Sequence, residues 1–182
     1  RMYEAIEGTE KEQAKCLMGL GNVYWRTGKF NDAEANYKEA LRMFEAIEGT
    51  EMEQAKCLMN LGAVYENTGK FNDAEANYKE ALRMYKAIEG TEKEQARCLM
   101  NLGVVYENTG KFNDAEANYK EALGMFEAIP GTEMEQATCL ASLGNVYKST
   151  GKFNDAEANY KEALGMLEAI DGTEIEQAKC LT

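Results

Sequence analysis

One stretch of fifteen residues occurs four times in this chain without a single difference, and it constrains the fold more than any other feature. The stretch reads Thr-Gly-Lys-Phe-Asn-Asp-Ala-Glu-Ala-Asn-Tyr-Lys-Glu-Ala-Leu and begins at Thr27, Thr68, Thr109 and Thr150, so the period is 41 residues. A fixed period of this size is typical of a stacked array, in which each unit covers the apolar face of its neighbour.

The second repeat shows how each unit is expected to begin. Thr50 and Glu53 have the spacing of a capping box, in which each side chain bonds a free amide at the start of a helix. A first helix is therefore predicted over residues 51–67, and Gly69 is expected to end it in a left-handed conformation. The same pair of residue types recurs at Thr9/Glu12, Thr91/Glu94, Thr132/Glu135 and Thr173/Glu176.

A second helix is predicted over residues 72–88 of the same repeat. Asp73 places a carboxylate at the positive end of the helix dipole, and Gly90 stops the helix. In the third repeat we expect an earlier end, near Ala128, because Pro130 disfavours helical backbone in the residue before it. The connections are short, and short connections make neighbouring helices antiparallel.

These patterns predict an all-α fold, a right-handed α-solenoid of antiparallel helix pairs in a single array. Neither end of the array carries a polar capping helix, so we expect molecules to associate head to tail. The expected segments are residues 1–8 as the end of a preceding second helix, repeats at 9–49, 50–90, 91–131 and 132–172, and residues 173–182 as the start of a fifth repeat.

The first helix of each repeat is predicted to contact two neighbours. At 100° per residue its apolar side chains point in two directions, which together form a wide arc. In the first repeat the larger group comprises Leu17, Leu20, Gly21 and Tyr24, and the smaller group comprises Cys16 and Val23. Glycine at position 21 and alanine at positions 33 and 40 are expected to let the helices approach closely.

The motif within each repeat resembles the tetratricopeptide repeat. In the second repeat it reads Leu61-Gly62-Ala63-Val64-Tyr65, followed by Gly69, Phe71, Ala74, Tyr78 and Ala81-Leu82. The chain departs from that pattern by leucine in place of an early tryptophan, by the absence of a closing proline and by its longer period. Long repeats of this kind are similar to those of kinesin light chains and of Pins-type spindle-orientation adaptors.

The resemblance implies that the remaining arc of each first helix lines a concave groove that receives a peptide or a helix of a partner. Chaperone-binding relatives hold a C-terminal carboxylate there, but methionine stands in place of a clamp lysine in three repeats, so that ligand is not expected. The candidate partner-binding residues are Lys15, Met18, Asn22, Trp25, Arg26, Lys56, Met59, Glu66, Asn67, Arg97, Met100, Glu107, Asn108, Asn145 and Lys148.

Two features of this arc have alternative interpretations. The methionines at positions 18, 59 and 100 are either an adaptable apolar groove floor or ordinary packing between adjacent helices. Trp25 is either a binding hot spot or a tolerated surface substitution, since the other repeats carry glutamate or lysine at its position.

The composition argues against several functional classes. The chain has no histidine, so the commonest general base is absent, and neither an enzyme nor a cofactor site is expected. A formal charge of −12 argues against nucleic acid and anionic membrane surfaces as partners. No apolar run is long enough to span a bilayer. Cysteine occurs once per period, which favours buried thiols in a reducing, cytoplasmic setting.

The sequence therefore predicts a non-enzymatic scaffold that binds a protein or peptide along its concave face. The alternative is a structural or engineered repeat array whose main contact is head-to-tail self-association. Near-identical repeats leave little room for one specialised pocket, which suits a repeated binding surface or a scaffold.

Overall fold

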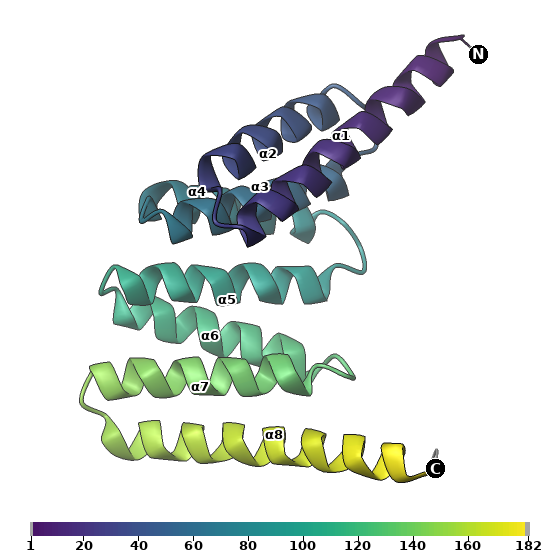
Figure 1. Ribbon diagram of the computed structural model, residues 1–182. Coiled ribbons are helices and arrows are strands. Elements are labelled where there is room, and N and C mark those ends of the chain that lie inside the picture. Colours follow the sequence, from purple (N-terminus) through teal and green to yellow (C-terminus); the bar gives the residue numbers. More distant parts are fainter. Residues whose placement is uncertain (1, 181–182) are drawn as a thin grey trace. The chain divides into compact units, whose positions relative to one another are not determined.

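The computed structural model describes the backbone of residues 2–180 and the side chains of residues 9–170, and the described chain is helical throughout (Figure 1). The predicted all-α class is confirmed. The helices are α1 (Met2–Arg26), α2 (Phe30–Glu45), α3 (Glu51–Asn67), α4 (Phe71–Lys86), α5 (Glu92–Asn108), α6 (Phe112–Glu127), α7 (Glu133–Ser149) and α8 (Phe153–Cys180).

The helix boundaries of the second repeat follow the sequence pattern closely. Helix α3 begins and ends at the predicted residues, and Gly69 has a φ of 73°, which confirms the left-handed stop. Helix α4 begins one residue before the predicted start and ends at Lys86, two residues before the predicted end. Its last turn closes with a bond from the Ile88 amide to the Tyr85 carbonyl, which tightens the helix end.

The predicted capping box is wrong. Thr50 occupies the N-cap of α3, but its hydroxyl makes no bond to an amide of that helix. It donates instead to the carbonyls of Phe44 at 2.6 Å and Ile47 at 2.8 Å, both at the end of the preceding repeat. Thr132 has the same pair of bonds in the second half of the chain. The side chain is fully buried, and in that position satisfying carbonyls of the previous helix and of the turn that follows it outweighs capping the next helix.

The predicted shortening of a helix by Pro130 is also wrong. Helix α6 ends at Glu127, and α4 ends at Lys86, one period earlier. The helices of these repeats therefore stop at equivalent positions. Proline has no effect on the boundary because position 130 lies in the turn, where the helix has already ended.

The two ends of the described chain differ from the internal repeats. Helix α1 runs through Gly8 without the predicted break, and α8 runs through Gly172 to Cys180 instead of folding back as a fifth repeat. An internal turn is held by packing between the two helices that it joins. A backbone that continues as helix through these glycines keeps the helical hydrogen bonds that a turn would break.

The chain divides into two compact units, Arg1–Thr91 and Glu92–Thr182, each with two helix pairs. In the first unit α2 packs against both α1 and α3, and α3 packs against α4. The second unit repeats this order with α5 to α8. The antiparallel pairing predicted from the short connections is thus confirmed within each unit.

Each helix pair is joined by a close approach between a glycine and a tyrosine ring. A Cβ atom added at Gly103 would lie 2.5 Å from Cε1 of Tyr119, and Gly21 faces Tyr37 in the same way. The prediction that glycine allows close approach at this position is confirmed. Small alanine side chains also lie in this helix–helix contact, where Ala33 and Ala40 are fully buried.

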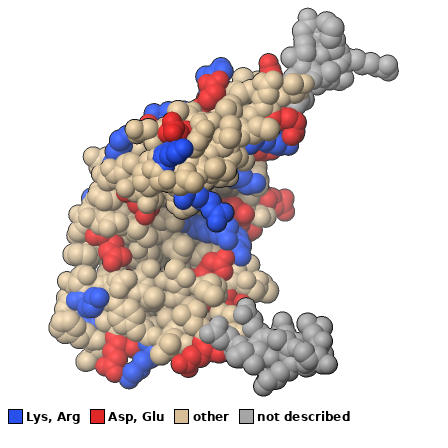
Figure 2. Space-filling view, viewed as in Figure 1, with Lys and Arg blue, Asp and Glu red and all other residues tan. Residues whose placement is uncertain are grey.

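Among the described residues, no helix is long and apolar enough to cross a membrane. Acidic and basic side chains lie interspersed on the face shown in Figure 2. Cys57, Cys98 and Cys139 are buried thiols, as the repeat pattern predicts. Cys16 is exposed, contrary to that prediction, because its face of α1 has no helix packed on it in the described structure. The side chain of Cys180 lies outside the described residues.

Candidate functional site

A cleft of about 310 Å³ lies in the first unit where α1, α2 and α3 meet. Helices α1 and α3 are the first helices of successive repeats and contact each other directly. The cleft is therefore on the face that the sequence predicts to bind a partner. It is lined by Asn22, Trp25, Arg26, Tyr37, Asn60 and Ala63.

Asn22 connects the three helices around the cleft. Its Oδ1 accepts a 2.7 Å hydrogen bond from the hydroxyl of Tyr37 on α2 and a 3.3 Å bond from Nδ2 of Asn60 on α3. Burial raises the pKa of Tyr37 to about 12, so the phenol stays protonated and remains a donor. The Oδ1 atom of Asn22 is thus occupied, while its Nδ2 group makes no hydrogen bond to another described residue.

The tyrosine at the position of Tyr37 donates a hydrogen bond from its hydroxyl in every repeat, but the residue type of the acceptor differs between repeats. In the first and fourth repeats the acceptor is asparagine, and in the second and third it is a glutamate three positions further along the first helix. The bonds are Tyr37 to Asn22, Tyr78 to Glu66, Tyr119 to Glu107 and Tyr160 to Asn145. These four candidate partner-binding residues therefore each hold the helix pair of their own repeat together.

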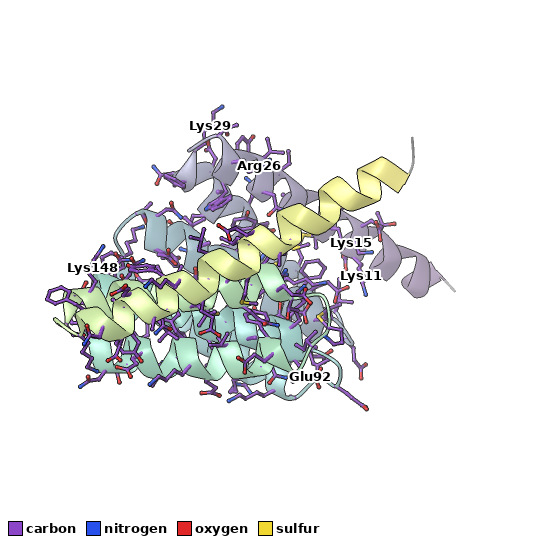
Figure 3. All side chains as sticks on the ribbon, turned by 90° about the horizontal axis from the view of Figure 1, so that it is seen from below. Lys11, Lys15, Arg26, Lys29, Glu92 and Lys148 are labelled. Carbon is purple, nitrogen blue, oxygen red and sulfur yellow. The ribbon has the colours of Figure 1, made fainter. Side chains whose placement is uncertain are left out.

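Trp25 and Arg26 give the cleft its apolar and charged character. The indole side of the cleft is open, since Trp25 is 39% exposed. Arg26, at the end of α1 opposite to Lys11 and Lys15, makes no ion pair with a described residue (Figure 3). No carboxylate lines the cleft. The cleft therefore offers an aromatic surface, an amide and a guanidinium to a ligand, although the chain as a whole is strongly acidic.

The methionines of this face take part in packing. Met18 packs against the cluster of Ala14, Ala40, Phe44 and Cys57, and its sulfur lies 3.9 Å from Sγ of Cys57. Met59 and Met100 occupy the equivalent positions on α3 and α5 and are half-buried. For Met18 these contacts favour packing between adjacent helices over an open groove floor.

The other predicted residues of the first unit lie outside the cleft. Lys15 pairs with Glu12 on its own helix at 2.7 Å, and Asn67 donates to the carbonyl of Ala63, also on its own helix. Lys56 is exposed on α3.

In the second unit the predicted residues lie on α5 and α7. Arg97 pairs with Glu135 at 3.2 Å, which joins the first helices of two repeats, and Lys93 pairs with the same carboxylate at 2.9 Å. Asn108 is exposed at the end of α5, and Lys148 is exposed near the end of α7.

Asn60 and Tyr37 are cleft residues that the sequence analysis did not select. Asn60 lies one position after Met59 and was assigned to neither apolar arc. A signal for Tyr37 existed in the sequence: where alanine or valine replaces Asn22, glutamate replaces Trp25. That joint change indicates a shared hydrogen-bond partner, which the structure identifies as the tyrosine.

The described residues contain no cluster of three or more cysteine, aspartate and glutamate side chains that could hold a metal ion. The cleft provides hydrogen-bond donors, one positive charge and an aromatic surface. That combination suits binding of a polar or acidic chain segment.

A family model described as tetratricopeptide repeat matches the chain in three overlapping windows, at residues 12–87, 53–128 and 94–169. No curated protein sequence matches the chain. Among solved structures, the chain is similar to BtubC (BKLC) from P. vanneervenii, with 28% identity and a TM-score of 0.79. It is also similar to aspartyl phosphate phosphatase F from Bacillus subtilis, with 15% identity and a TM-score of 0.83. A third similar structure is the apo form of RapI, with 18% identity and a TM-score of 0.78.

These structural matches cover 87%, 89% and 88% of this chain in the same order. The chain spans 65%, 42% and 44% of the three matched chains, which is less than two thirds of each. At their low identities, the second and third matches bear on the fold alone.

Proposed function

We propose that this chain, which belongs to the tetratricopeptide repeat family, is a non-enzymatic scaffold that binds an extended segment of a partner protein along the face formed by its first helices. Family membership supports a protein-interaction role in general. The cleft between α1 and α3 is the observation that carries the finer proposal.

The chemistry of the cleft indicates what kind of segment would bind. An apolar side chain of the partner would cover Trp25, and a carboxylate would pair with Arg26, which has no acidic neighbour in the cleft. The Nδ2 group of Asn22 and the Oδ1 atom of Asn60 would bond the carbonyl and amide of an extended backbone. Reduced thiols in the described core are compatible with the cytoplasm, where we place this activity.

Trp25 is the single tryptophan of the chain, so its fluorescence reports on the cleft directly. An array of acidic and neutral peptides would be screened with the 182-residue chain, and hits would be titrated while the fluorescence is followed. Arg26→Ala should weaken acidic hits by roughly tenfold, because it removes a charge-assisted hydrogen bond. Ala63→Glu should abolish binding, because it places a carboxylate in the cleft.

Lys86→Ala is the matched control, because it removes an exposed positive charge from α4, away from the cleft. It should leave the affinity unchanged. A position equivalent to Ala63 carries valine in the third repeat and asparagine in the fourth, so the fold accepts larger side chains there. Hits that bind Ala63→Glu as tightly as the parent chain would contradict the proposed site.

A second candidate function is a structural array whose main contact is with copies of itself. Exposed apolar side chains on α1 and α8 favour this candidate, with Val23 57% exposed and Phe153 68% exposed. It does not exclude the first, because these side chains lie outside the cleft.

A further inference from the structure

Successive repeats within each unit are held by one recurring contact. In the first unit, Glu34 on α2 accepts a 3.1 Å hydrogen bond from the hydroxyl of Tyr65 and pairs with Lys70 at 3.3 Å. Its own-helix partner Lys38 lies 2.6 Å away and 5.8 Å from the centre of the Tyr65 ring. A glutamate and a lysine of one repeat thus bind a tyrosine and a lysine of the next.

The same contact occurs independently in the second unit. Glu116 on α6 accepts from Tyr147 at 3.1 Å and pairs with Lys152 at 3.2 Å and Lys120 at 2.7 Å. Lys152 and Lys120 lie 5.2 Å and 5.8 Å from the centre of the Tyr147 ring. The lysines hold the pKa of Glu116 below its usual value, with Lys120 the largest cause. We call this arrangement the repeat joint.

One half of the repeat joint is exposed on α8. Glu157 and Lys161 are the equivalents of Glu34 and Lys38 and form the same 2.6 Å pair, but Glu157 is 63% exposed where Glu34 is 18% exposed. They lie beside an apolar groove of about 390 Å³. The groove is lined by Lys148, Phe153, Ala156, Glu157, Tyr160, Lys161 and Leu164.

The other half of the repeat joint is exposed on α1. Tyr24 and Lys29 are the equivalents of Tyr65 and Lys70, and the ammonium of Lys29 lies 5.8 Å from the Tyr24 ring centre. Beside them, Leu20 is 48% exposed, whereas its equivalent Leu61 on α3 is buried. This face therefore presents the groups that α3 uses to pack on α2.

We propose that the 182-residue chain self-associates by forming the repeat joint between molecules, with α1 of one copy seated on the groove of α8 of another. The proposal rests on the second candidate function and names its contacts. Tyr24 and Lys29 of one copy bind Glu157 of the other, Lys161 faces the Tyr24 ring, and Leu20 and Val23 fill the groove beside Leu164. A second copy is the occupant because the chain twice forms this contact with itself, residue for residue.

The two faces differ, so the contact is heterologous and does not close on itself as a two-fold dimer does. The mean mass in solution should therefore rise continuously with concentration and not stop at a dimer. Exposed charges at the contact make the association weaker as salt is added.

Charge reversal on either face tests the proposal. Glu157→Lys places a new lysine beside Lys161, so that both face Lys29 of the next copy. Lys29→Glu places a carboxylate opposite the carboxylate of Glu157. Each variant alone should associate roughly tenfold or more weakly than the parent chain by sedimentation equilibrium, because like charges meet at the contact. Glu162→Lys makes the same change in net charge at an exposed position on α8 outside the groove and should associate as the parent does.

Mixing the two variants is the decisive measurement. In a mixture, the α8 face of the Glu157→Lys variant can bind the α1 face of the Lys29→Glu variant, and the two unchanged faces can bind each other. Association should therefore return to within about threefold of that of the parent chain. Misfolded variants could not restore association in this way. A parent chain that stays monomeric up to millimolar concentration would overturn both the second candidate function and the repeat joint. Association that both charge reversals leave unchanged would overturn the repeat joint and retain self-association.

Discussion

The hydroxyl of Tyr78 donates a 3.0 Å hydrogen bond to Oε2 of Glu66, in the place where Tyr37 of the preceding repeat donates to Asn22. The tyrosine ring covers a glycine on the first helix in both repeats, so its position is fixed by the backbone. Only the acceptor changes. An asparagine reaches the hydroxyl from one position, and a glutamate reaches it from three residues further along the same face.

The Tyr78–Glu66 bond predicts a pH-dependent effect for Glu66→Gln. Burial raises the pKa of Glu66, so the folded state binds its proton more tightly than the unfolded state does. The wild type is therefore penalised at pH 7, and the penalty fades as pH falls through the raised pKa towards the ordinary value of 4.5. Glutamine keeps an acceptor and removes the buried charge.

Urea denaturation should show Glu66→Gln as at least as stable as the wild type at pH 7, by up to about 1 kcal/mol, with a smaller difference at pH 5. Glu45→Gln makes the same change in charge at an exposed site on α2 and should show neither effect. A variant that is less stable at pH 7 and equally so at pH 5 would show that the charge on Glu66 is not penalised.

Gly103→Ala should destabilise the chain by about 1–3 kcal/mol, because the new Cβ would meet the Tyr119 ring, itself fully buried. Gly124 lies in the neighbouring helix α6 with nothing near its Cβ position. Gly124→Ala should therefore stabilise by about 0.5–1 kcal/mol through helix propensity. Chemical denaturation of both variants checks the pair, and changes of the same sign would contradict the close approach.

Gly69→Val should also destabilise, by roughly 1–3 kcal/mol, but for a different reason. Nothing lies near the Cβ position, so the cost comes from holding a β-branched residue at a φ of 73°. Gly69→Asn, which tolerates that conformation better, should cost less than the valine variant. Equal thermal unfolding midpoints for the valine and asparagine variants would argue against a backbone effect.

Thr50→Val should cost about 1–2 kcal/mol, because it keeps the side-chain shape and removes the buried donor shared by two carbonyls. Thr68→Val is the control: its hydroxyl also bonds two carbonyls, those of Val64 and Tyr65 in the last turn of α3, but the residue is exposed. That variant should change the free energy of unfolding by less than about 0.5 kcal/mol. The opposite ranking would show that the two carbonyl bonds of the Thr50 hydroxyl contribute little to stability.

Thiol reactivity should separate Cys16 from the buried cysteines. Burial raises the pKa of Cys57, Cys98 and Cys139 to about 12, so almost none of these thiols is ionised at pH 8. In a Cys180→Ser background, Ellman's reagent should modify one thiol rapidly and three only on unfolding. Rapid modification of two or more thiols under native conditions would show that the core opens.

The sequence predicted the helices well because their signals are local. The repeat period and the glycine stops predicted both ends of α3 correctly. The glycine at position 21 predicted a close approach between helices there, although not that Tyr37 is the residue it meets. The capping role of Thr50 was wrong because its hydroxyl donates to carbonyls six and three residues back, at the end of α2 and in the turn after it, which only the folded turn brings within reach.

The candidate site was less predictable from the sequence. The resemblance placed Asn22, Trp25 and Arg26 on one face, and they do line one cleft. The second amide of the cleft, Asn60, was missed because it bonds Asn22 of the neighbouring repeat, at a distance that depends on how α1 packs against α3. Whether these residues bind a partner stays a prediction.

Within each unit a helix packs mainly on the helices next to it in the chain, and the turns between them are three to five residues long. Contacts of low sequence separation cost little loop-closure entropy, so the barrier to forming one helix pair is small. Refolding should accordingly be fast, on the order of microseconds to milliseconds, as for other helical proteins of low contact order. Nucleation can occur at any pair and spread to its neighbours, so a substitution that slows one pair leaves the others available to start the reaction.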